Sequence, residues 1–233
     1  MKVRIWELDA VRGVLLLFMV FIHLMVDLTY LYGILDWQFP LWFDVLIELD
    51  GIGFVLLSGL CATLGRHSVR RGLLVLACGL TVTAATYCMY LFGFDKSILI
   101  YFGVLHCLGV CMLLWPLLRR LPTWALVALG VAMVPVGYLV IPHIYLEQLW
   151  LLPLGIHPYV FATSDYFPLL PNLGYFLVGA ALGRCLYRKK ATLFPRVNPQ
   201  NPIIRALCFC GRQSLVIYMV HQPILSGLCM LLL

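Results

Sequence analysis

Apolar stretches dominate the sequence, and short polar connections separate them. Seven are long enough to cross a bilayer as an α-helix, which needs about 20 residues. We place them at about 13–34, 45–65, 72–92, 97–118, 123–141, 170–187 and 203–232 of the chain. The pattern predicts an all-α, polytopic membrane helical bundle of about seven transmembrane helices. We expect it to form a single domain over residues 1–233.

Composition agrees with membrane helices and leaves no room for a separate soluble domain. The 233 residues are 63% hydrophobic and 11% charged, whereas soluble domains are about 45–50% apolar and about 25% charged. The first stretch is longer than the core of a signal peptide, and Glu7 and Asp9 interrupt its basic start, so we expect it to stay in the membrane. We therefore expect an integral membrane protein surrounded by membrane lipid, with a homodimer as a possible assembly.

The basic residues predict an orientation. With a cytoplasmic N-terminus, all but Lys96 of the 16 Lys and Arg residues fall on the inner side. They include Lys2, Arg4, Arg12, Arg66, Arg70, Arg71, Arg119 and Arg120, and the remainder lie between Arg184 and Arg212. Cytoplasmic loops carry such an excess, so we expect the N-terminus inside and the C-terminus outside. The net charge of +6 is explained by topology and does not indicate nucleic-acid binding.

Three ionisable residues share one face of the first stretch. Arg12 and His23 are eleven residues apart, which returns a helix to nearly the same face after a rise of about 16 Å. Asp27 lies one turn beyond His23, at the spacing where helical side chains meet. Arg12 thus marks one membrane surface and His23 lies near the midplane. An ionisable group at that depth is a functional-site hypothesis by default, because burying it in lipid is costly.

His106 and His221 lie about nine residues into the fourth stretch and about nine residues past Arg212, which predicts a similar depth. A single intramembrane His is often satisfied by a bond between helices, but three at one depth favour a shared polar cavity. A carboxylate beside an imidazole suits a general base or a nucleophile that accepts an acyl group. A three-His metal site is the competing interpretation. No HxH or HxxxH spacing supports it, and we expect no metal.

The one long outer connection, residues 141–170, is rich in aromatic residues. Its candidate residues are Trp150, Asp165 and Tyr166. The aromatic side chains are consistent either with an interfacial belt or with a platform for a sugar-like acceptor. Walker, GxSxG, GxGxxG and HExxH motifs are missing from the sequence, so hydrolase, ATPase and dinucleotide functions have no motif behind them.

Several stretches together resemble a known family. Arg12 and His23 in LDAVRG…MVFIH resemble the signature of bacterial integral-membrane acyltransferases. The wider set is RIWELDAVRG, MVFIHLMVDL, FGVLHCLG, DYFPLLPNLGYFLVGAALG and GRQSLVIYMVHQPIL. With these, the chain resembles the short bacterial relatives of heparan-α-glucosaminide N-acetyltransferase from Arg4 to about Leu225. That membrane enzyme moves acetyl from cytosolic acetyl-CoA to a glucosamine on the far side.

The resemblance implies an acyl-CoA-dependent transmembrane acetyltransferase with a sugar or glycolipid acceptor. It implies that His23 is the central catalytic group and that Arg12 lies at the cytosolic mouth near the CoA. Ser214, Tyr218 and His221 would belong to a closing motif. The lysosomal enzyme has a catalytic His in the outer loop between its first two spans, and the corresponding DWQFPLWFD here has none. The reaction would then run through His23.

The charges of the chain suit such a donor. CoA carries several phosphates, and guanidinium groups pair well with phosphate. Arg12, Arg66, Arg70 and Arg71 are the candidates, with Arg119 and Arg120 also on the inner side, although topology alone also explains basic loops. An acceptor from outside would approach past Asp27 and Asp165. Two alternatives stay open: a proton-coupled small-molecule transporter, and a structural subunit in which the histidines are packing contacts.

Overall fold

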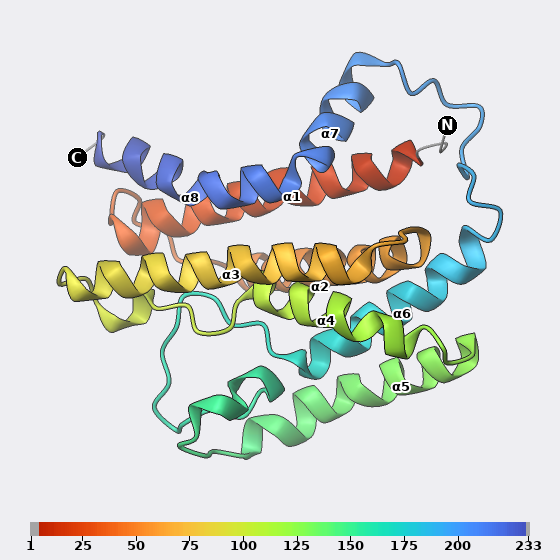
Figure 1. The fold of residues 1–233 in the computed structure, drawn as a ribbon. Helices are drawn as coiled ribbons and strands as arrows, with labels where there is room; N and C mark the ends of the chain where they lie inside the picture. The colour runs from red at the N-terminus through yellow and green to blue at the C-terminus, as the bar shows by residue number, and fades with distance from the viewer. Residues whose placement is uncertain (1–4, 232–233) are drawn as a thin grey trace. The chain divides into compact units, whose positions relative to one another are not determined.

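The computed structural model describes residues 5–231, and its regular elements are α-helices and short 3₁₀ and π-helical turns, joined by irregular connections. The all-α class is therefore confirmed. The α-helices are α1 (Trp6–Val26), α2 (Leu41–Leu64), α3 (Ser68–Leu91), α4 (Val104–Leu118), α5 (Thr123–Pro135), α6 (Leu169–Leu186), α7 (Pro202–Arg212) and α8 (Ser214–Met230) (Figure 1). Between them lie η1 (Asp27–Leu31), η2 (Lys96–Ile98), η3 (Val136–Val140), η4 (Ile141–His143) and η5 (Leu149–Leu154).

Five helical stretches are long and apolar enough to cross a membrane: residues 6–31, 41–64, 68–91, 123–143 and 169–186. Helices α7 and α8 would add a sixth if the pair, bent by 83°, is one span. The predicted count of seven is not confirmed, because α4 has only 15 residues. Residues 99–103 are not helical, since the carbonyls of Leu99 and Phe102 accept hydrogen bonds from the segment before α6. The side on which each terminus lies stays a prediction.

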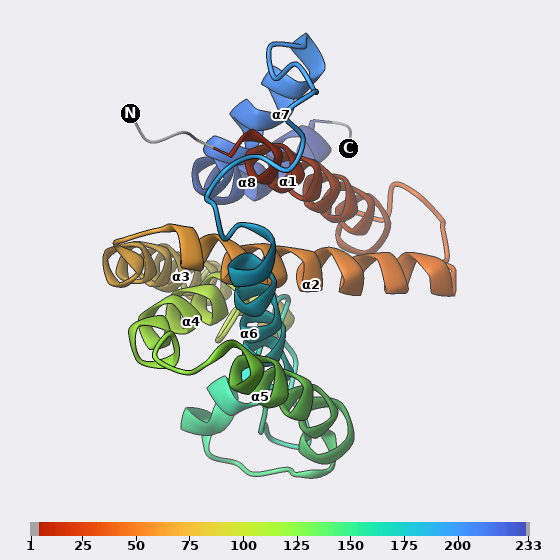
Figure 2. The same cartoon turned by 90° about the vertical axis from the view of Figure 1, so that its right-hand side faces the viewer.

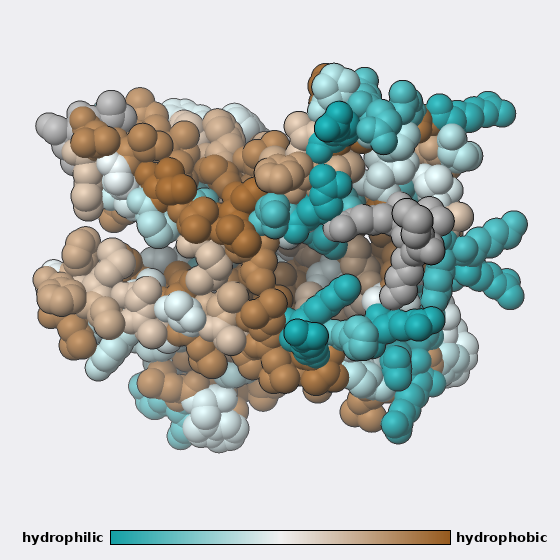
Figure 3. Space-filling model, turned by 45° about the horizontal axis from the view of Figure 1, so that its top comes forward, coloured by the Kyte–Doolittle hydropathy of each residue, from teal (hydrophilic) through white to brown (hydrophobic). Residues whose placement is uncertain are grey.

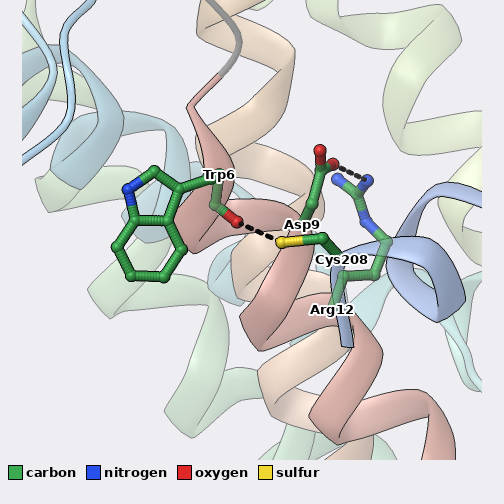
Figure 4. A network of polar contacts seen from close by, with 4 residues as sticks. All are labelled: Trp6, Asp9, Arg12 and Cys208. Atoms are coloured by element: carbon green, nitrogen blue, oxygen red, sulfur yellow. Dashed lines mark hydrogen bonds and ion pairs between the residues drawn. The ribbon is translucent and has the colours of Figure 1, made fainter. Parts of the chain in front are cut away.

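The chain forms two compact units. The first combines residues up to Phe54 with those from Lys189 onward, and the second is Val55–Arg188. In the first unit, α1 and α7 approach backbone to backbone at two glycines. A Cβ on Gly13 would meet the carbonyl of Leu207, and a Cβ on Gly211 would meet the carbonyl of Asp9. Only glycine leaves room for this contact. Beside it, Sγ of Cys208 donates to the carbonyl of Trp6 at 3.3 Å (Figure 4).

Other contacts of the first unit bring in α8, α2 and the segment after α6. The hydroxyl of Tyr32 donates to the carbonyl of Ser226 at 3.4 Å, which joins the C-terminal end of η1 to α8. Gly53 of α2 faces the side chain of Leu15. Buried Glu7 accepts from the hydroxyl of Thr192 at 3.0 Å and from the backbone N–H of Leu193 at 2.8 Å. These bonds fasten the connection to α7 onto the first turn of α1.

In the second unit, α4 lies beside α3 and α5 beside α6 (Figure 2). Its core contains Trp115, Phe176 and Leu177, each almost fully buried. Arg184 of α6 donates to the carbonyls of Leu121 and Arg119, both at 2.7 Å, and lies over the Trp115 ring. A guanidinium that binds terminal carbonyls stabilises a helix end, because those carbonyls have no partner within the helix.

The outer surfaces of the helices are apolar, as lipid contact requires. Hydrophobic residues cover much of the face that Figure 3 displays. Exposed examples on separate helices are Leu41 at 79%, Leu74 at 57% and Trp124 at 74%. Side chains of this kind would be an aggregation hazard in water. The protein is an integral membrane protein.

Candidate functional site

Two imidazoles meet within the first unit. His23 lies on α1 and His221 on α8, and their ring centroids are 4.9 Å apart with the planes at 84°. His221 is buried at 7% exposure, and His23 is half-buried. The sequence analysis predicted a polar cavity shared by His23, His106 and His221, and of these the first unit contains His23 and His221, edge to face.

Backbone carbonyls fix the same tautomer in both rings. Nδ1 of His23 is 2.9 Å from the carbonyl oxygen of Met19, and Nδ1 of His221 is 2.6 Å from that of Tyr218. A carbonyl only accepts, so each Nδ1 carries a hydrogen and each neutral ring has its lone pair on Nε2. Within residues 5–231, Nε2 of His221 is buried and has no hydrogen-bond partner. A buried polar atom left in this state is unusual and indicates a bound partner or a chemical role.

The sequence analysis placed Asp27 one turn beyond His23, at the spacing where helical side chains meet. In the structure, the carboxylate of Asp27 does not bind the His23 ring. The carboxylate instead accepts from Nε2 of Gln222, at 3.0 Å to one oxygen and 2.8 Å to the other. Asp27 is buried at 4% exposure and begins η1, where the helix widens into a π-turn. Such turns are frequent at functional sites. The Met19 carbonyl, not the carboxylate, holds the His23 ring.

The closing-motif residues lie on α8 around His221. Tyr218 is one turn earlier, and its ring centroid is 5.3 Å from that of His221. Ser214 is the first residue of α8 and is half-buried. Tyr218 therefore lines one side of the imidazole and also supplies the carbonyl that fixes its tautomer.

Arg12 lies on α1, eleven residues before His23 and thus about 16 Å along the helix. Its guanidinium is 3.7 Å from the carboxylate of Asp9, as Figure 4 shows, and its side chain is 25% exposed. The ion pair holds the guanidinium near the first turns of α1, where Glu7 also lies. Lys2 and Arg4, which the sequence analysis placed on the same side, lie outside the described residues.

Arg66, Arg70 and Arg71 lie in the second unit at the connection between α2 and α3, and all three are exposed. Arg71 is on the first turn of α3, near Gly65. Exposed guanidinium groups at one helix end are suited to bind a phosphate-rich molecule.

His106 differs from the other two histidines. Its helix begins at Val104, so it lies in the first turn and not nine residues into a helix. Nδ1 accepts from the N–H of Gly103 at 3.2 Å, and Nε2 lies 3.2 Å from the hydroxyl of Thr83, which donates to the carbonyl of Ile100. Gly79 of α3 leaves room for the ring. Nδ1 thus bonds within the start of α4, and Nε2 joins α4 to α3.

The outer-connection candidates separate into two kinds. Asp165 accepts from the N–H of Val104 at 3.0 Å and so caps the start of α4. Tyr166 donates to the carbonyl of Leu152 at 2.8 Å, and burial raises the pKa of Tyr166 to about 12, so it stays protonated. Its ring packs near His157 and Phe161. Trp150, on η5, is 74% exposed and remains available for lipid or for an acceptor.

Sequence reasoning missed two polar residues. Gln222 lies in the quoted stretch GRQSLVIYMVHQPIL but was not singled out. Its amide next to His221 was the signal, because a buried carboxylate such as Asp27 needs a hydrogen-bond donor. Asp50 lies in the interior of α2, which begins at Leu41, and is buried at 6% exposure. Its Oδ1 has no hydrogen-bond partner in the described part of the chain. Across residues 5–231, no group of three or more His, Cys, Asp or Glu is placed to hold a metal ion.

Comparison with known families decides the identity. The family described as heparan-alpha-glucosaminide N-acetyltransferase, catalytic, matches residues 4–223. The chain belongs to this family. The match spans α1 to the middle of α8, so it includes His23, Asp27, His221 and Gln222. Comparisons with curated proteins and with solved structures gave no match.

Membership in the heparan-alpha-glucosaminide N-acetyltransferase family makes this a transmembrane acetyltransferase-like protein. The resemblance that the quoted stretches carried from Arg4 to about Leu225 is confirmed over nearly its whole length. The roles of single residues rest on the geometry above.

Proposed function

We propose that the protein is an acyl-CoA-dependent acetyltransferase. It moves acetyl from cytosolic acetyl-CoA to a sugar or glycolipid on the far side of the bacterial inner membrane. His23 and His221 are the catalytic groups, and lipid surrounds the helices. The donor and the acceptor are substrates that approach from opposite sides. The observation that carries this proposal is the imidazole pair, with both Nδ1 atoms bound to carbonyls and a buried, unpartnered Nε2 on His221.

The lone pair on Nε2 is the reactive group in this proposal. Nε2 accepts the proton of an acceptor amine or hydroxyl, and that nitrogen or oxygen then forms a bond to the thioester carbonyl carbon. The C–S bond breaks, and the CoA thiolate takes the proton back from the imidazolium. In the alternative order, Nε2 itself attacks the thioester carbonyl and the CoA thiolate leaves as the C–S bond breaks. The acceptor nitrogen or oxygen then attacks the acetyl group, the bond to Nε2 breaks, and the acceptor's proton goes to the thiolate. Either order needs a neutral ring with hydrogen on Nδ1, which the carbonyls of Met19 and Tyr218 provide.

Arginines bind the acyl-CoA donor in this proposal. Arg12 lies about 16 Å along α1 from His23, a length that an extended pantetheine arm can span. Arg66, Arg70 and Arg71 are exposed and suited to CoA phosphates. His106 and Asp165 take no part in the proposed reaction, because both are bound at the start of α4.

The test is transfer of radiolabelled acetyl from acetyl-CoA in membranes that contain the wild type, His221→Ala or His143→Ala. His143 is exposed and serves as the matched control. We expect acetyl-CoA turnover, including slow hydrolysis, in the wild type and in His143→Ala, and a loss of at least 100-fold in His221→Ala. Equal turnover in all three would remove the imidazole from the mechanism. Uptake of a solute into proteoliposomes without acetyl-CoA consumption would favour a transporter.

A further inference from the structure

The contact between Asp27 and Gln222 fixes the orientation of an amide. Nε2 of Gln222 donates to both carboxylate oxygens of Asp27. An ionised carboxylate only accepts hydrogen bonds, so the NH₂ end of the amide must face Asp27. Oε1 therefore lies on the opposite side of the amide, and exchanging it with Nε2 would break both bonds. Asp27 thus fixes the orientation of the Gln222 amide, so that Oε1 is the atom left to accept a further hydrogen bond.

This acceptor has no donor among residues 5–231. Oε1 of Gln222 is buried and unpartnered, and so are Nε2 of His221 and Oγ1 of Thr29. His221 and Gln222 are neighbours on α8, and Thr29 follows Asp27 by two residues in η1. Leaving a buried acceptor unsatisfied lowers stability. Two of these atoms can only accept, so they need donors that a bound molecule can supply.

We propose that Gln222 selects the acceptor of acetyl transfer by accepting a hydrogen bond from a hydroxyl or ammonium group of that molecule. The inference rests on the proposed function. The acceptor must then carry two donor groups: one that loses its proton to an imidazole Nε2, and a second that binds Oε1 of Gln222. Aminosugars and polyols meet this requirement, whereas a simple amine does not. Asp27 is a positioning residue that acts through Gln222.

Two ring amines test the requirement. Glucosamine and cyclohexylamine both offer one amine on a six-membered ring, but only glucosamine has hydroxyls. We expect the wild type to transfer labelled acetyl to glucosamine with a kcat/KM at least tenfold higher than to cyclohexylamine. A site built to bind a hydroxyl rejects analogues that lack it, because its own polar group is then left unpaired.

Variants test whether Gln222 is the residue that distinguishes glucosamine from cyclohexylamine. Gln222→Met should reduce the ratio of the two kcat/KM values at least tenfold, mainly by raising the KM for glucosamine. Asp27→Asn frees the amide to rotate and should reduce the ratio as well, with no further loss in the double variant. Gln38→Met, an exposed glutamine of the same unit, should leave the ratio unchanged.

Four results would overturn the inference. For the wild type, they are equal use of the two amines and transfer to neither amine. For a folded Gln222→Met protein, they are an unchanged ratio and an equal loss for both amines, which would make Gln222 structural. Failure of the proposed function has a different signature, because acetyl-CoA would then not be consumed at all, even by water.

Discussion

The rings of His23 and His221 meet edge to face at 4.9 Å, with the hydrogen of each ring on Nδ1. Rings in direct contact share one environment, so a substitution at either one also affects the other. We therefore treat the pair as one unit in the first prediction.

We expect His23→Ala and His221→Ala each to lower kcat for acetyl transfer about 10²–10⁴-fold, the usual contribution of a general base. Because the rings are in contact, the double variant should lose little more than either single variant. Initial rates with labelled acetyl-CoA at saturating donor would measure this. Strictly multiplicative losses would show that the two rings act separately.

His106→Ala should lower stability and leave the turnover of folded protein unchanged, because Nδ1 of His106 binds the backbone at the start of α4 and Nε2 joins α4 to α3. Losing two hydrogen bonds of ordinary strength costs about 1–3 kcal/mol. Thermal unfolding in detergent measures the loss, and Thr83→Val, which removes one of the partners, should lose less. A folded His106→Ala protein without activity would place His106 in the reaction.

Asp165→Ala should remove the cap of α4 and cost about 0.5–2 kcal/mol. Its carboxylate accepts from the N–H of Val104, so Asp165→Asn, which can still cap, should retain most of the stability. Unfolding temperatures and the KM for glucosamine should be measured together. A raised KM at unchanged stability would instead support the acceptor-platform interpretation of this connection.

Gly13→Ala should disrupt the contact of α1 with α7, since its Cβ would meet the carbonyl of Leu207. Overpacking of this kind costs about 1–3 kcal/mol or more where backbone is the obstacle. Gly227→Ala is the matched control, because no atom lies within 4 Å of its added Cβ. Folded yield and unfolding temperature compare the two. Equal stability would mean that the α1–α7 contact is not needed for folding.

Converting Arg66, Arg70 and Arg71 together to Gln should raise the KM for acetyl-CoA with little change in kcat. The residues are exposed, so their attraction for phosphate is screened by salt. The difference from the wild type should therefore shrink as ionic strength rises. Rates at 0.05 and about 0.5 M salt would test this, and a KM that is unchanged at low salt would assign these arginines to topology alone.

The sequence by itself determined the helical class, the membrane setting and the family. Long apolar runs need no tertiary information to be recognised, because each helix satisfies its own backbone hydrogen bonds. Helical periodicity also placed Arg12, His23 and Asp27 on one side of α1. The quoted stretches carried the family relation, which spans residues 4–223.

Only the tertiary structure decided which ionisable groups act together. Asp27 and Gln222 are 195 residues apart, so no local pattern reveals that the amide and not His23 binds the carboxylate. Asp165, which lies 61 residues beyond Val104, caps the start of α4. Because α4 begins at Val104, His106 lies in its first turn and not in mid-helix as predicted. Spacing along a helix determines the direction of each side chain and its height along the axis. The partner of a buried polar group depends instead on which distant element of the chain packs against it.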